Sequence, residues 1–185
     1  MVTPAMSYFL HKGLCIHGYI EESFLMFRER FGRMLAPNTN GTLWEEWWLD
    51  GTGRSGTMQK GRTRSDAQTE SAFPPALFAE YLLGIRPVMP GMKKIELYRS
   101  QSGLRQVEGT IPSPEGKLFV RWNLDEDGSG ELDVEIPRGM QVELDLASLG
   151  VSDTKQIFIN GRPLIPDTDR SPGYLLSGGR HEVKF

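Results

Sequence analysis

The hydrophobic pattern of this 185-residue chain changes its period once, near residues 87–91, and this change constrains the fold more than any other feature. Before that point apolar residues recur every three or four positions, as on one face of a helix. After it apolar and polar residues alternate, as in a strand with one buried face. Prolines and a glycine at the change interrupt both patterns. The sequence therefore predicts an α+β protein in two parts, residues 1–88 and 89–185.

Three helices are predicted in the first part, over roughly residues 4–14, 19–35 and 72–83. The third is expected to have Ser71 as its N-cap and Gly84 just past its end. The second has the clearest pattern, because its apolar residues fall on one stripe that faces a core. The stripe consists of Ile20, Phe24, Phe27, Phe31 and Met34.

The second part has the alternation and the turn residues of short strands. Seven or eight strands in so short a stretch predict an antiparallel β-sandwich. The turn at residues 125–131 faintly resembles a calcium loop, but Ile136 stands where such a loop needs its bidentate acid, so a hairpin turn is expected. The candidate strands are residues 95–97, 104–111, 118–122, 132–136, 142–146, 156–159 and 182–185.

Charge and motifs argue against several classes of function. A net charge of -3 gives no reason to expect nucleic acid or an anionic membrane surface as a partner. The three histidines lack metal-ligand spacing, and the glycine-rich residues 51–56 lack the strand and helix of a phosphate-binding loop. We therefore expect no metal and no cofactor.

The sequence does not decide the cellular compartment. Residues 1–13 lack the basic start and apolar middle of a signal peptide, and no apolar run approaches the ~20 residues of a membrane span. The location is therefore unknown, and the alternatives are cytoplasmic or, for a full-length parent protein, periplasmic or secreted.

The chemistry is expected in the stretch Asn40–Trp48, which holds three of the four tryptophans beside Glu45 and Glu46. Indole faces pack against sugar rings, and a carboxylate among them can act as an acid, a base or a nucleophile. The alternative is that the tryptophans are ordinary core or interface residues and that both carboxylates are solvated. A polar loop over residues 49–70 follows, and so long a loop is usually functional or disordered.

The order of these segments resembles the C-terminal end of bacterial α-L-rhamnosidases of glycoside hydrolase family 78. In that family an (α/α)6 barrel is followed by a C-terminal β-sandwich. The resemblance implies that residues 1–88 are the last helices of an incomplete barrel and that residues 89–185 are the sandwich domain. The matching pieces are Thr42–Glu45 with Trp47, Tyr81–Pro87, Pro90–Lys93 and Val107–Gly116.

The resemblance also implies a reaction and its residues. Glu45 would be the general base of an inverting hydrolysis of terminal α-L-rhamnosides, and Trp44 and Trp47 would line the rhamnose subsite. Gln68 aligns with a position where many relatives carry a histidine, so it is expected to bind the substrate, and the identity of the sugar stays open. The expected partner is therefore a rhamnose-containing carbohydrate or glycoside.

The family's general acid lies in an earlier part of the barrel, which these residues do not include. We therefore expect a C-terminal fragment that is inactive alone and needs the remainder of the catalytic barrel. Its helix faces should be exposed or covered by self-association, with several of Phe9, Phe24, Phe27, Phe31 and Tyr81 among them. The alternative is a non-catalytic carbohydrate-binding or domain-interface module, in which the tryptophans only stack.

Overall fold

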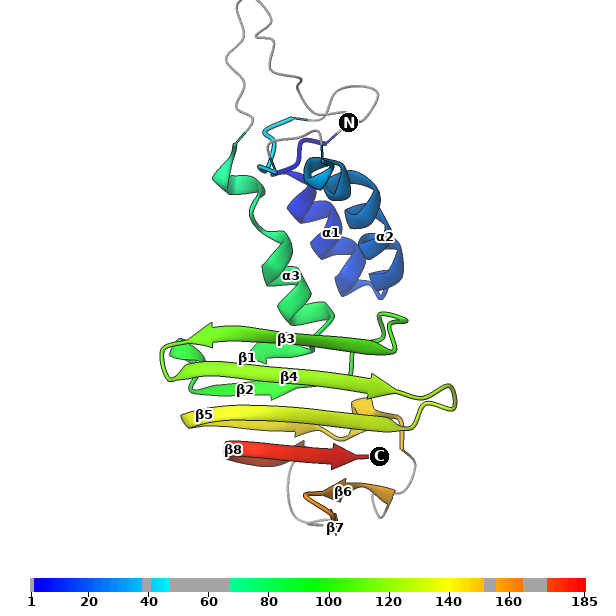
Figure 1. The fold of residues 1–185 in the computed structure, drawn as a ribbon, viewed down its shortest axis with the longest axis vertical. Helices are drawn as coiled ribbons and strands as arrows, with labels where there is room; N and C mark the ends of the chain where they lie inside the picture. The colour runs from blue at the N-terminus through cyan, green and yellow to red at the C-terminus, as the bar shows by residue number, and fades with distance from the viewer. Residues whose placement is uncertain (1, 38–40, 47–66, 152–155, 165–172) are drawn as a thin grey trace, which may run out of the picture. The chain divides into compact units, whose positions relative to one another are not determined.

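The computed structural model describes residues 2–37, 41–46, 67–151, 156–164 and 173–185 (Figure 1). The chain divides into two compact units, Met1–Leu77 and Phe78–Phe185. The first is called the helical unit below and the second the sheet unit. Each unit is described by itself.

Three α-helices occur in the described part of the chain, as predicted. They are α1 (Ser7–Ile16), α2 (Ile20–Arg30) and α3 (Pro74–Tyr81), and the last turn of α3 belongs to the sheet unit. A 3₁₀ turn over Phe31–Leu35 extends α2, and another over Thr69–Ser71 precedes α3. The predicted stripe of α2 is largely confirmed, because four of its five residues are buried. These are Ile20, Phe27, Phe31 and Met34.

Helix α1 buries its more polar face. Ser7, His11 and Cys15 are buried, whereas Met6 just before the helix is 55% exposed and Phe9 is 66% exposed. The expectation of exposed aromatic rings is therefore right for Phe9. It is wrong for the three aromatic residues that pack inside their own units, which are Phe27, Phe31 and Tyr81.

His11 joins α1 to α2 inside the helical unit. Its ring stacks on Phe27 with 3.7 Å between ring centroids, and its Nδ1 is hydrogen-bonded to Ser23 Oγ at 2.8 Å. The His11 side chain is almost completely buried, and this desolvation lowers its pKa to about 4. The imidazole is therefore neutral at neutral pH and serves as an uncharged part of the core.

The sheet unit contains eight strands in one hydrogen-bonded sheet among its described residues. All pairings are antiparallel except that of β2 with β5, which is parallel. The strands are β1 (Ile85–Pro87), β2 (Lys94–Leu97), β3 (Gln106–Ser113), β4 (Gly116–Leu124), β5 (Gly130–Asp145), β6 (Phe158–Ile159), β7 (Arg162–Pro163) and β8 (Gly173–Lys184). The sheet is thus mostly antiparallel, rather than antiparallel throughout as predicted.

Strand β5 is one strand of 16 residues where the sequence predicts two. Its first half pairs with β4 and its second half with β2, while β8 pairs along both halves. The register of β5 against β8 shifts between Ile136 and Gln141. Residues 137–139 therefore form an irregularity within a continuous strand and not a turn between two strands.

Both halves of β5 contribute side chains to a single core of the sheet unit. Strands β2 and β4 pair with different halves, yet Ile95 and Leu97 of β2 share one core cluster with Leu118 and Val120 of β4. The sheet therefore folds over a single core in the manner of a sandwich. Alternate residues of β5 line that core, and they are Leu132, Val134, Ile136, Met140, Val142 and Leu144.

Gly84 connects the end of α3 to β1. Its φ is +75°, a conformation that side chains other than glycine rarely adopt, and a Cβ atom there would lie 1.7 Å from the Tyr98 carbonyl oxygen. The Gly84 carbonyl in turn accepts a hydrogen bond from the Tyr98 backbone N–H at 3.0 Å. Only glycine fits this close approach, but α3 ends at Tyr81, so Gly84 lies three residues past the helix and not at the predicted position directly after it.

Side chains of the sheet satisfy carbonyl groups at the end of α3, which have no partner within the helix. Burial raises the pKa of Tyr98 to about 12, so its hydroxyl stays a hydrogen-bond donor. The donor–acceptor pairs are Tyr98 Oη to Glu80 O at 2.6 Å, Ser100 Oγ to Tyr81 O, and Trp122 Nε1 to Leu83 O at 3.0 Å.

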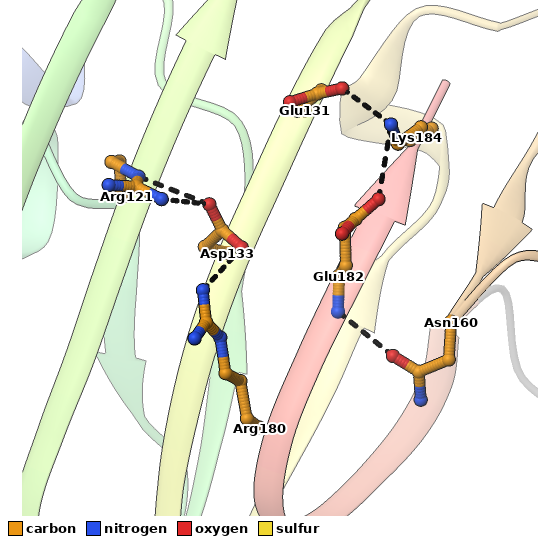
Figure 2. Close-up of polar contacts among 7 residues, drawn as sticks. All are labelled: Arg121, Glu131, Asp133, Asn160, Arg180, Glu182 and Lys184. Carbon is orange, nitrogen blue, oxygen red and sulfur yellow. Dashed lines mark hydrogen bonds and ion pairs between the residues drawn. The ribbon is translucent and has the colours of Figure 1, made fainter.

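The polar face of β4, β5 and β8 carries ion pairs between neighbouring strands, as Figure 2 shows. Asp133 on β5 lies 2.5 Å from Arg121 on β4 and 3.7 Å from Arg180 on β8. Lys184 on β8 pairs with Glu131 on β5 at 2.8 Å. Asp133 is buried and its pair with Arg121 is part-buried, whereas the exposed pair of Lys184 with Glu131 contributes little stability. Asp133 alternates along β5 with the core residues Leu132 and Val134, which favours the observed register.

Candidate functional site

The segment that carries Glu45 is held by hydrogen bonds from residues 68–71. Residues 42–46 form neither helix nor strand. The Gln68 backbone N–H donates to the Leu43 carbonyl at 2.8 Å, and the Ser71 hydroxyl donates to the Trp44 carbonyl at 2.9 Å. Both bonds lie within the helical unit. The structure therefore places the segment that carries Trp44 and Glu45 beside residues 68–71.

The two predicted site residues in this segment differ in burial. Trp44 is only 8% exposed, so little of its indole is open to a ligand, whereas Glu45 is half-buried. Part of the Glu45 side chain is therefore accessible, while part is covered by protein.

Gln68 is also half-buried, and its side chain faces Ser71. The Gln68 Oε1 atom lies 3.3 Å from Ser71 Oγ. The Ser71 hydroxyl has one proton, which the Trp44 and Gln68 oxygens share as acceptors. The predicted sugar contact is thus connected to the segment that carries the predicted base. Trp47 and residues 49–66 of the polar loop lie outside the described residues.

The prediction that Ser71 caps the third helix is wrong. Helix α3 begins at Pro74, and Ser71 ends the preceding 3₁₀ turn. A helix that begins at Pro74 has its N-cap at residue 73, two positions after Ser71. The hydroxyl instead binds the Trp44 carbonyl, 27 residues earlier in the chain. Pro74 was the signal in the sequence, because proline favours the first helical position and so places the N-cap at residue 73.

Other features of the described residues add no second site. No group of three or more His, Cys, Asp or Glu residues there could hold a metal ion, and no described helix is long and apolar enough to cross a membrane. The turn between β4 and β5 is the hairpin turn expected. Ser129 donates to Asp127 Oδ1 from its hydroxyl at 2.7 Å and from its backbone at 3.0 Å, which lowers the pKa of Asp127.

The structure defines an α+β protein in which a buried tryptophan, Trp44, is followed directly by the half-buried Glu45. Residues 84–156 match the family model of the bacterial alpha-L-rhamnosidase C-terminal domain. A curated alpha-L-rhamnosidase from Alteromonas sp. (strain LOR) is 28% identical over 126 residues, which cover 64% of this chain and 13% of that protein.

Solved structures show the same fold over nearly the whole chain. The alpha-L-rhamnosidase of Streptomyces avermitilis, solved with L-rhamnose, matches 99% of the chain with a TM-score of 0.66 and 15% identity. The alpha-L-rhamnosidase from Dictyoglumus thermophilum matches 98% with a TM-score of 0.68 and 16% identity. The chain spans 17% and 20% of these two proteins. The resemblance found in the sequence is thereby confirmed: the chain is related to the C-terminal part of bacterial α-L-rhamnosidases.

Proposed function

We propose that this chain acts as the C-terminal part of an inverting glycoside hydrolase for terminal α-L-rhamnosides, and that Glu45 is its general base. The observation that carries the proposal is the placement of Glu45. It is half-buried, directly follows Trp44, and sits in a segment held by two hydrogen bonds in a chain with a rhamnosidase fold.

The proposed chemistry needs a second carboxyl group. In an inverting hydrolysis the base takes a proton from water as the water oxygen attacks the anomeric carbon, while an acid protonates the departing oxygen. The two carboxyl groups stand ~6.5–9.5 Å apart, with the water between the base and the sugar. Glu46 directly follows Glu45, and neighbouring residues do not point at one sugar, so Glu46 is not the proposed acid. The resemblance to α-L-rhamnosidases places the acid in an earlier part of the barrel, and we propose that it comes from outside residues 1–185.

The substrate contacts are proposed for Trp44, Trp47 and Gln68. The half-buried Gln68 amide could hydrogen-bond a sugar hydroxyl with the capacity that Ser71 leaves unused. Trp44 would form a wall of the subsite behind Glu45, since most of its surface is packed.

The proposed partner is the remainder of an (α/α)6 barrel, to which the helices of this chain would belong. The exposed side of α1 supports this partner, because Phe9 and Leu10 follow Met6 at helical spacing and form one apolar face. A second copy of the chain could cover the same face, which makes self-association the competing arrangement.

One observation favours the alternative of a non-catalytic binding or interface module. Trp44 is packed inside the helical unit, as expected of a structural residue. The two functions differ in what they predict for Glu45, since only catalysis requires its carboxylate.

The test compares Glu45→Gln with Glu46→Gln in the completed barrel. By completed barrel we mean residues 1–185 joined to the rest of a rhamnosidase, either in a native polypeptide that carries them or in a chimera with the Dictyoglumus thermophilum enzyme. On an aryl α-L-rhamnoside, Glu45→Gln should lower kcat by about 10²–10⁴-fold, and Glu46→Gln should lower it far less. The 185-residue chain alone should not hydrolyse the substrate. Near-normal kcat in Glu45→Gln would remove Glu45 from the mechanism.

A further inference from the structure

Ser71 is fully buried, and its hydroxyl donates a hydrogen bond to the Trp44 carbonyl, which belongs to the peptide group that joins Trp44 to Glu45. We propose that Ser71 is a positioning residue, which fixes the direction in which the Glu45 side chain leaves the backbone. This inference rests on the proposed role of Glu45 as the base. It adds a residue and a route by which the fold controls that base.

The geometry follows from the planarity of the peptide bond. The Trp44 carbonyl and the Glu45 nitrogen lie in one plane, so a hydrogen bond that holds the carbonyl also restricts the orientation of Glu45. The preceding peptide group is held as well, because the Leu43 carbonyl accepts from the Gln68 backbone. Two consecutive carbonyls are thus held from one short turn, the 3₁₀ turn over residues 69–71 with its N-terminal neighbour.

This support matters because residues 42–46 have no secondary structure to hold them. A general base must stay within hydrogen-bond reach of its water, and a misplacement of about 1 Å can cost about 10²-fold in rate. Ser71 also lies beside the Gln68 amide, so the same hydroxyl aligns the proposed base and the proposed sugar contact. Loss of that hydroxyl should therefore disturb the reaction more than the fold.

Ser23 provides a matched control within the same unit. Its side chain is also completely buried, and its hydroxyl is hydrogen-bonded to His11. Ser23 joins α1 and α2 and has no hydrogen bond to residues 42–46 among those described. Removing either hydroxyl deletes one oxygen atom from a buried site. A difference between the two variants therefore reports the place of the hydroxyl and not its burial.

The first measurement is NMR-detected amide hydrogen exchange in the 185-residue chain. Ser71→Ala should speed exchange of the Gln68 amide, which bonds Leu43, by about tenfold or more while the α2 amides change little. Ser23→Ala should show the opposite pattern. This readout does not depend on activity. Exchange of the Gln68 amide within twofold of wild type in Ser71→Ala would overturn the proposal.

The second measurement is kinetic and uses the completed barrel. Ser71→Ala should lower kcat by about tenfold to 10²-fold with KM within about threefold, while Ser23→Ala should keep kcat near wild type. If Glu45→Gln abolishes turnover and Ser71→Ala leaves kcat unchanged, the positioning role is wrong. If Glu45→Gln retains turnover, the proposed function fails instead, and the exchange experiment still decides whether Ser71 holds the segment.

Discussion

The sheet unit and the helical unit place their apolar side chains differently. In the sheet unit Leu132, Val134 and Leu144 are fully buried in one core, and exposed apolar residues such as Leu104 and Phe158 are scattered. In the helical unit the exposed apolar residues near and on α1 share one face, while His11 and three serines are buried. The sheet unit closes its own core, whereas the helical unit leaves an apolar face of α1 exposed.

The largest effect should come from truncating the closed core. Leu132→Ala removes a fully buried side chain near the start of β5 and should lower the free energy of unfolding of the sheet unit by about 2–5 kcal/mol. Denaturant unfolding, monitored through hydrogen exchange of the β4 and β5 amides, measures this loss of stability. A loss below about 0.5 kcal/mol would show that this core is not the source of the unit's stability.

The next effect concerns the backbone at the start of the sheet unit. Gly84→Ala should lower the free energy of unfolding by about 2–4 kcal/mol, because the added methyl group meets the Tyr98 carbonyl. Gly91→Ala is the matched control, since Gly91 also has a positive φ but has no atom near its Cβ position. It should cost only about 1 kcal/mol. Equal losses in thermal unfolding would mean that the contact at Gly84 is unimportant.

A pH-dependent effect should be confined to the helical unit. The pKa of His11 is about 4 in the folded protein and 6.5 in the unfolded chain, so the unfolded chain binds more protons between these values. The stabilisation is fully present above pH 6.5 and is lost as the pH falls towards 4, by about 3 kcal/mol in total. Hydrogen exchange of α1 and α2 at pH 7 and pH 4.5 measures this loss.

His11→Gln serves as the control for the acid effect, because its amide does not titrate and can still bond Ser23. The acid-induced loss in α1 and α2 should largely disappear in this variant. If it persists unchanged, another group is responsible. Exchange in the sheet unit should be the same with and without His11.

The smallest effect should come from the exposed face of α1. Phe9→Ser should change the free energy of unfolding of the 185-residue chain by no more than about 0.5 kcal/mol, because Phe9 is 66% exposed. The same change should weaken assembly of the completed barrel, measured by its thermal midpoint. A large loss in the chain alone would show that Phe9 packs within the unit.

The sequence predicted the two kinds of structure because hydrophobic period is a local signal. Two separate strands were predicted where β5 is one, because residues 137–139 look like a turn. Strand β8, about 40 residues later in the chain, pairs with β5 on both sides of these residues. The parallel pairing of β2 with β5 is equally non-local. Pairing partners far along the chain decide both features, and no single stretch contains that information.

The candidate site was predictable in part. Trp44 and Glu45 stood out by residue type, and the resemblance pointed to Gln68, which the structure brings beside them. Ser71 was given the wrong role, because a serine before a helix usually caps it and its true acceptor is 27 residues away. Side chains that support a site from a distant segment leave little pattern in the sequence.

The most direct test of the account is azide rescue of Glu45→Ala in the completed barrel. Azide carries no proton and needs no base to attack the anomeric carbon, so it can replace water in an inverting enzyme that has lost only its base. Hydrolysis of an aryl α-L-rhamnoside should fall by about 10²–10⁴-fold in Glu45→Ala, and added azide should restore aryl release with a β-L-rhamnosyl azide as the product. Hydrolysis at the wild-type rate without azide would contradict the central role of Glu45.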